Sequence, residues 1–229
     1  MLPYNVTQKY EALIQSLKDA GTSADCGDVA EAKPIAACFR LNDTGDAVFF
    51  DCALLLKQWK WKGVSGKERI NILVQARERI RREDQVLLTS VVAVNYFQVP
   101  SGELLQAFHF DYDPDQADHP LFHMQVTNRC IELPPESVEQ LEINMPPEPA
   151  HRVLRCARIP TCDMTFASVL LCLTADHVGG TIFAEFLERV CWLQQDMPQP
   201  DIGKLSVSLG GGVPNMRSSH WFRHLLPRA

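Results

Sequence analysis

The feature that most constrains the fold is a series of segments rich in valine and aromatic residues in the middle of the chain. Three of them follow one another with short links, at residues 86–99, 103–111 and 121–127. Valine, phenylalanine and tyrosine favour strands, and strands joined by short links pair as antiparallel neighbours. We therefore predict an antiparallel sheet at the centre of the fold.

Helical spacing of apolar residues flanks these strands on both sides. Ser65, with Glu68 three residues later, also has the pattern of a capping box, which predicts that a helix begins there. Helices are predicted at 6–20, 65–82, 164–177 and 182–193. Shorter strands are predicted at 35–41, 47–50 and 153–159, while 54–61 fits either a strand or a helix.

This order of elements predicts an α+β protein, with an antiparallel sheet and helices packed mainly on one face. Apolar residues make up 46% of the chain and charged residues 22%, which is typical of a globular protein. The 229 residues fit a single domain, 1–229. The stretch 133–149 contains five prolines, so a division near 133–150 stays open.

The sequence predicts a cytoplasmic protein without a membrane partner. The first ten residues, MLPYNVTQKY, have no apolar core and no cleavage pattern, so we expect no signal peptide. The longest apolar runs are much shorter than the ~18 residues of a membrane-spanning helix. The eight cysteines include no CxxC pair, which favours free thiols in a reducing compartment.

Charge is distributed unevenly along a chain whose net charge is −6. Residues 51–82 contain nine Lys or Arg against three acidic residues, whereas 83–150 contain twelve acidic residues against one Arg. Such asymmetry is typical of a surface that binds a polyanion. Alternatively, the two segments pack side by side and neutralise each other.

Tryptophan and lysine alternate at the end of the 54–61 segment. Nucleic-acid bases stack on exposed aromatic rings while lysines contact phosphates, so this pattern is a candidate nucleic-acid surface together with the basic segment that follows. The other interpretation is that the tryptophans belong to the core and the lysines are solvated. The candidate binding residues are Trp59, Lys60, Trp61, Lys62, Arg77, Arg81 and Arg82.

The predicted hairpin of 103–111 and 121–127 has one aromatic face and one polar face. Side chains alternate along a strand, so His109 and Asp111 share a face, as do His123 and Gln125 on the second strand. A register that pairs His109 with His123 places the two polar faces together and the two aromatic faces together.

This polar face is the candidate catalytic site, composed of His109, Asp111 and His123. Imidazole and carboxylate groups transfer protons near neutral pH, so the three residues suit general acid–base catalysis. The same residues are the candidate ligands of a divalent transition metal such as zinc, manganese or iron. The alternative is a solvated sheet face that carries two ordinary histidines.

The hairpin sequence FHFDYDPDQADHPLFHMQ, residues 108–125, resembles a motif of small uncharacterised bacterial proteins that occur among mobile elements and in defence islands. Their motif reads RYDYDP…HPxxH, and Arg158-Ile-Pro-Thr followed by an apolar helix is similar as well. The resemblance covers about 103–190 and places Asp111, Asp113, His119 and His123 in the motif. The arginine that begins the motif is replaced here by Phe108 and His109.

The resemblance implies a cellular context, bacterial antiviral defence or mobile elements, but no reaction. One hypothesis is therefore an interaction protein of such an assembly, with a protein partner or a second copy of the chain. The alternative is a nuclease or another hydrolase of nucleic acid or nucleotides that depends on a metal or on histidine acid–base catalysis. Nucleic acid would then bind through 51–82.

Overall fold

The computed structural model describes residues 4–61, 68–114, 122–126, 158–161, 164–194 and 197–200. The helical elements among these are α1 (Tyr4–Ser23), the short 3-10 helix η1 (Ile35–Cys38), α3 (Phe166–His177) and α4 (Gly180–Gln194). The strands are β1 (Val29–Glu31), β2 (Phe39–Leu41), β3 (Ala47–Lys60), β4 (Arg69–Arg81), β5 (Leu87–Gln98), β6 (Leu104–Tyr112), β7 (Phe122–Val126) and β8 (Arg158–Pro160).

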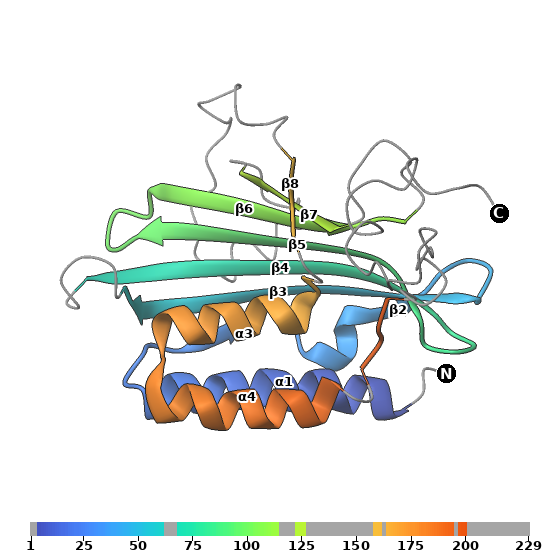
Figure 1. Cartoon of the computed structure of the whole chain (residues 1–229), viewed down its shortest axis with the longest axis horizontal. Helices are drawn as coiled ribbons and strands as arrows, with labels where there is room; N and C mark the ends of the chain where they lie inside the picture. Colours follow the sequence, from blue (N-terminus) through green and yellow to red (C-terminus); the bar gives the residue numbers. More distant parts are fainter. Residues whose placement is uncertain are drawn as a thin grey trace, which may run out of the picture.

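The strands form one sheet in the order β1-β3-β4-β5-β6-β7-β8, and β2 pairs with β3 beside β1. Each of these strand pairs is antiparallel. The helices α1, α3 and α4 lie together on one side of this sheet (Figure 1). The predicted fold class is therefore confirmed. We call the side that faces these helices the covered face, and the opposite side the open face.

The covered face is the main core, because alternate residues of the central strands point toward the helices. Buried side chains from β3, such as Leu54, and from β4, such as Ile72, pack against Leu13 of α1 and Leu170 of α3. Trp59 is fully buried here, and a Cβ on Gly21 of α1 would come within 3.1 Å of the indole ring. Glycine therefore lets α1 approach this ring closely.

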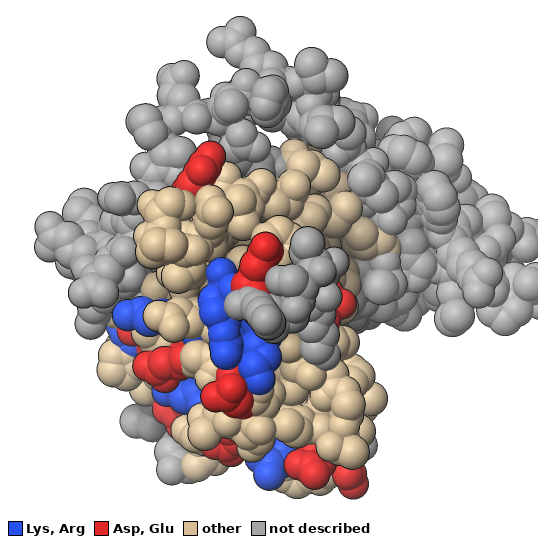
Figure 2. All heavy atoms as spheres, turned by 90° about the vertical axis from the view of Figure 1, so that its left-hand side faces the viewer, with Lys and Arg blue, Asp and Glu red and all other residues tan. Residues whose placement is uncertain are grey.

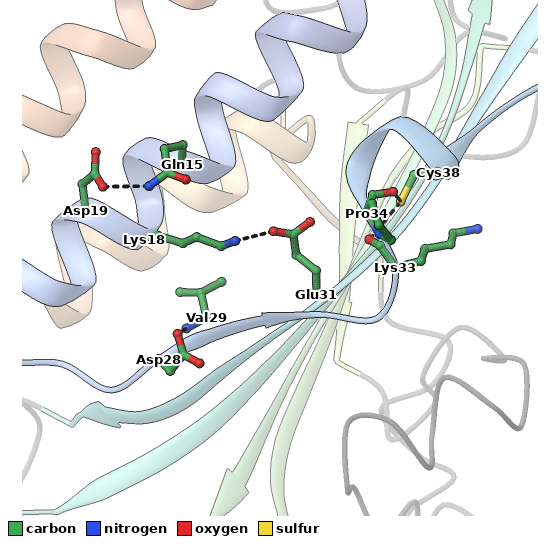
Figure 3. A network of polar contacts seen from close by, with 9 residues as sticks. All are labelled: Gln15, Lys18, Asp19, Asp28, Val29, Glu31, Lys33, Pro34 and Cys38. Atoms are coloured by element: carbon green, nitrogen blue, oxygen red, sulfur yellow. Dashed lines mark hydrogen bonds and ion pairs between the residues drawn. The ribbon is translucent and has the colours of Figure 1, made fainter.

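Polar contacts fix the helices to the sheet at its first edge (Figure 3). Lys18 of α1 forms an ion pair with Glu31 of β1, and the backbone N–H of Val29 donates to Asp28 Oδ1 at 2.8 Å. The ion pair joins α1 to β1, the Asp28 contact is local to the start of β1, and backbone pairing holds β1 to the long strand β3.

A buried carboxylate connects four elements on the covered face. Glu78 of β4 accepts hydrogen bonds from the Tyr10 hydroxyl of α1 at 2.5 Å, from Ser90 Oγ of β5 at 3.1 Å and from the Phe166 backbone N–H at 3.0 Å. Phe166 begins α3, so Glu78 also binds the positive end of that helix dipole. Burial, followed by the nearby charge of Glu78, raises the pKa of Tyr10 well above its ordinary value.

The helix predicted at 65–82 is wrong: its described part is strand β4, Arg69–Arg81. The apolar residues that suggested helical spacing are buried on both faces of the sheet, since Leu73 packs on the open face while Ile72 and Val74 pack on the covered face. The segment 54–61 is a strand as far as Lys60. Residues 35–38 form η1 instead of a strand.

The other three predicted helices are confirmed as α1, α3 and α4. None of the described helices is both long and apolar enough to span a bilayer. The stretch 133–150 and most of the strand predicted at 153–159 lie outside the described residues.

Candidate functional site on the open face

The candidate residues lie on β6 and β7, near one edge of the open face. Asp111 pairs with His123, and His109 pairs with Gln125. The register therefore differs by two residues from the predicted one, which paired His109 with His123. A shift of two residues leaves every side chain on the same face. The four polar residues consequently share the open face as predicted, and the aromatic residues of the hairpin share the covered face.

Asp111 lies between the two imidazole rings. Its Oδ1 is 3.0 Å from His109 Nε2, and its Oδ2 is 3.3 Å from His123 Nε2. These are ion-pair distances, and the two contacts are not aligned as hydrogen bonds. The exposed fraction of the side chain is 29% for His109, 18% for Asp111 and only 3% for His123.

The electrostatics of this cluster keep Asp111 ionised. Burial alone would raise the pKa of this carboxyl group. The close contacts and positive charges of His109 and His123 act in the opposite direction and hold the pKa of Asp111 well below its ordinary value. Asp111 is therefore ionised at neutral pH and lies where it can orient the two imidazole rings.

In the cross-strand row that contains His109, a small residue of β5 lies between two polar residues of the neighbouring strands. Ala93 of β5 pairs with His109 on one side and with Gln75 of β4 on the other. Asn95 follows on the same face of β5 and is 0% exposed, and neither of its amide atoms has a hydrogen bond to the residues that the structure describes. An amide buried without a partner is costly, which makes Asn95 a candidate for binding a ligand.

Sequence reasoning did not single out Gln75 or Asn95. The sequence does contain a signal for Asn95. It follows Val91 and Ala93 on one face of β5, where the neighbouring positions are apolar. A polar residue at such a position of a buried central strand is uncommon, and it points to the site once the strand is known.

The predicted metal set does not surround a common point. In the described part of the chain, no group of three or more His, Cys, Asp or Glu side chains is arranged to hold a metal ion. The Nε2 atoms of His109 and His123 each face an oxygen of Asp111. These are the atoms that would become ligands if a divalent metal replaced the two contacts. His119 of the motif lies outside the described residues.

The Trp–Lys segment and the arginines do not form one surface. Trp59 lies in the core of the covered face, with its ring centroid 6.4 Å from that of His177, and Trp61 packs against the same core. Lys60 instead donates to the carbonyl of Ala24 at 2.6 Å. Lys62 lies outside the described residues.

The arginines of β4 lie on the opposite side of the sheet from Trp59 and Trp61. Arg77 and Arg81 alternate with covered-face residues and so belong to the open face, which also carries His109. Arg77 Nε is 2.6 Å from Asp51, and Arg81 Nη1 is 2.9 Å from Asp84. Arg82 donates to the carbonyl of Gly45 at 3.3 Å.

Acidic residues near the basic segment neutralise part of its charge. Asp25 is 3.4 Å from Lys60 Nζ and 3.8 Å from Arg69, and Asp51 also contacts Arg40 at 3.1 Å. In Figure 2, which views the end of the molecule at the left of Figure 1, basic and acidic groups touch over the described surface. Of the described acidic residues in 83–150, Asp84 contributes to this pairing.

Comparisons of the chain with protein-family models, curated proteins and solved structures find no match. The resemblance of 103–190 to the defence-associated bacterial proteins therefore stays a prediction.

Proposed function

We propose that the chain is a hydrolase that cleaves phosphoester bonds in nucleic acid or nucleotides by histidine acid–base catalysis on the open face. The observation that supports this proposal is the position of Asp111 between His109 and His123, at 3.0 Å and 3.3 Å. A carboxylate beside imidazole is a common arrangement for tuning a general base.

The three residues have different roles in this proposal, which follow from their exposure. His109, the most exposed of the three, transfers the proton. Asp111 orients its ring and stabilises the imidazolium. His123 is almost fully buried and positions Asp111 from the other side.

The reaction needs a nucleophile that loses a proton and a leaving group that gains one. His109 takes the proton from a water molecule as its oxygen forms a bond to phosphorus. The ester P–O bond then breaks, and the imidazolium gives the proton to the departing oxygen. One residue thereby serves as base and then as acid, so atoms and charge balance over the cycle.

Arginines on the same face favour a phosphate-containing substrate. Arg77 belongs to the same cross-strand row as Asp111, with Val91 between them. Neighbouring strands lie ~4.8 Å apart, so this row places Arg77 within reach of a second phosphate of an extended substrate.

The decisive comparison is between His109→Ala and Gln125→Ala, which truncate residues directly opposite each other on β6 and β7. We expect wild type to hydrolyse bis-p-nitrophenyl phosphate or a single-stranded oligonucleotide. Loss of a general base lowers the rate by about 100-fold or more, whereas Gln125→Ala should retain most of the rate. Both variants should melt within a few degrees of wild type.

His123→Ala should also abolish activity without a large fall in melting temperature. Because His123 is buried, His123→Gln provides a second variant if the alanine variant fails to fold. Absence of hydrolysis by wild-type protein, or full activity in His109→Ala, would contradict the proposal.

A metal-dependent form of the same proposal uses His109, Asp111 and His123 as ligands of a divalent transition metal. Elemental mass spectrometry of wild type and of the double variant His109→Ala/His123→Ala separates the two forms. A near-stoichiometric metal that is lost in the variant supports the metal-dependent form. Full activity of metal-free protein in chelator supports acid–base catalysis alone.

A second candidate function is that of an interaction protein in a cytoplasmic bacterial defence or mobile-element assembly. It is favoured by large apolar side chains on the outside of α4, where Leu187 is 38% exposed and Trp192 is 65% exposed. This hypothesis predicts a defined oligomer or complex that Leu187→Glu disrupts, whereas Glu188→Gln on the same helix leaves it intact. Multi-angle light scattering that shows only a monomer at every salt concentration would contradict it.

A further inference from the structure

A cavity of about 430 Å³ lies on the covered side of the sheet, separate from the candidate site on the open face. Aromatic side chains from three parts of the sheet line it: Trp61 after β3, Tyr96 of β5 and Phe108 of β6. Asp176 and His177, at the carboxyl end of α3, complete the lining together with the apolar Ile70 and Leu105 and the polar Gln106. Cavities of this size are typical of small-molecule sites.

The rings of Tyr96 and Phe108 are nearly perpendicular to each other and are not stacked. The ring centroids of Tyr96 and Phe108 are 6.2 Å apart, and their planes cross at 87°. The ring of His177 is 5.9 Å from that of Tyr96, and its Nδ1 donates to the carbonyl of Lys60 at 2.8 Å, which fixes its orientation. The walls of the cavity are therefore preformed.

The charges around the cavity favour a positive ligand. Asp176 is exposed at the lining, and no described residue forms an ion pair or hydrogen bond with it. The carboxyl end of a helix adds partial negative charge at the same place, and the face of an aromatic ring attracts cations. Within the described lining there is no lysine or arginine that would supply this positive charge.

The ionisation of Tyr96 reflects the same field. Burial, followed by the charge of Asp176, raises the pKa of Tyr96 to about 12. Burial disfavours a charge of either sign, but the negative charge of Asp176 that contributes to this shift also attracts a positive charge in the neighbouring cavity.

We propose that this cavity binds a small organic cation, an ammonium group with apolar substituents, between the rings of Trp61, Tyr96 and Phe108 and the carboxylate of Asp176. The apolar lining accommodates the substituents, while the rings and the carboxylate recognise the charge. The proposal is independent of the hydrolase proposal, because the two sites share no residue.

The test uses choline as the probe and 3,3-dimethyl-1-butanol as its neutral isostere. Binding is followed through the NMR signal of the Trp61 indole N–H, at constant ionic strength. We expect choline to bind at least about tenfold more tightly than the neutral alcohol, the difference that a partly desolvated cation–π contact provides. Asp176→Asn should weaken choline binding by about tenfold, which corresponds to one lost interaction with a charge.

Glu188→Gln on α4 is the matched control, because it removes the same charge from an exposed position outside the cavity. It should leave the affinity within about twofold. Trp61→Leu removes one wall, and its binding can be followed by calorimetry; it should also lose affinity for choline. Equal affinities for choline and the alcohol would identify an apolar cavity without cation recognition and overturn the proposal, as would the absence of any binding.

Discussion

Two buried polar side chains, one on each face of the sheet, differ in their hydrogen bonding. On the covered face, Glu78 accepts hydrogen bonds from Tyr10, Ser90 and the start of α3. On the open face, Asn95 is equally buried but has no hydrogen bond among the described residues. Burying an unpaired polar group costs about 1–3 kcal/mol. The difference indicates that Glu78 stabilises the fold through its hydrogen bonds, whereas the amide of Asn95 makes no such contribution.

The largest loss of stability is expected from a substitution on the covered face. Glu78→Ala leaves two hydroxyl groups and the first N–H of α3 buried without their acceptor. We expect a loss of about 3–5 kcal/mol in the free energy of unfolding, measured by urea denaturation. Glu68→Ala, at an exposed position next to β4, should change it by less than about 0.5 kcal/mol. Similar losses in the two variants would contradict a structural role for Glu78.

Tyr10→Phe removes one donor and keeps the ring that packs beside Phe50. A hydrogen bond to a charged group contributes about 1.5–3 kcal/mol, and we expect a loss in this range in the same measurement. Tyr96→Phe is the control, since its hydroxyl group has no hydrogen bond among the described residues. If both variants were equally stable, the bond from Tyr10 to Glu78 would contribute nothing.

A smaller effect is expected at Asp111, and it depends on pH. The folded-state pKa of Asp111 lies below the value of about 3.9 found in unfolded chains, so its ionised form stabilises the fold above that pH. This contribution is lost as the pH falls through the folded-state pKa. Asp111→Asn should therefore cost about 1 kcal/mol near pH 6, and the difference from wild type should shrink below about pH 4. A difference that grows on acidification would have the wrong sign.

The smallest effect on stability is expected at Asn95. Asn95→Leu replaces an unpaired amide with an apolar group of similar size, so stability should stay the same or rise by about 1 kcal/mol. Asn71→Leu is the matched control on the neighbouring strand, because Asn71 Oδ1 accepts a hydrogen bond from the Gln58 N–H at 2.8 Å and should lose stability. A large loss in Asn95→Leu would show that this amide is structural and would remove the contrast between the faces.

The sequence predicts best those elements whose local pattern agrees with their final environment. The helices α1, α3 and α4 and the strands of the hairpin follow the expected periods. Strand β4 was predicted as a helix because it is buried on both faces, so its apolar residues do not alternate. The buried Glu78 further hides the strand pattern, since a charge normally indicates a solvent-facing position.

The candidate site was predictable in composition but not in detail. Alternation along two strands is enough to group His109, Asp111 and His123 on one face. Which residue lies opposite which depends on the turn, and the structure pairs Asp111, not His109, with His123. Asn95 belongs to a third strand, so its proximity to the site follows only from the strand order of the sheet.

The irregularity near the end of β3 determines which side of the sheet the tryptophans face. Leu56 pairs with Ile72, but Trp59 pairs with Ile70, so two residues of β3 lie opposite a single residue of β4, and Gln58 adopts a positive φ of 55°. Without the bulge, regular alternation along the same sequence would direct Trp59 to the open face, because Leu56 and Trp59 are three positions apart. Deletion of one residue at 57–58 would therefore remove the bulge and leave Trp59 opposite Ile70 on the covered face. Insertion of one more residue would instead turn the end of the strand over, unless a second bulge absorbed it.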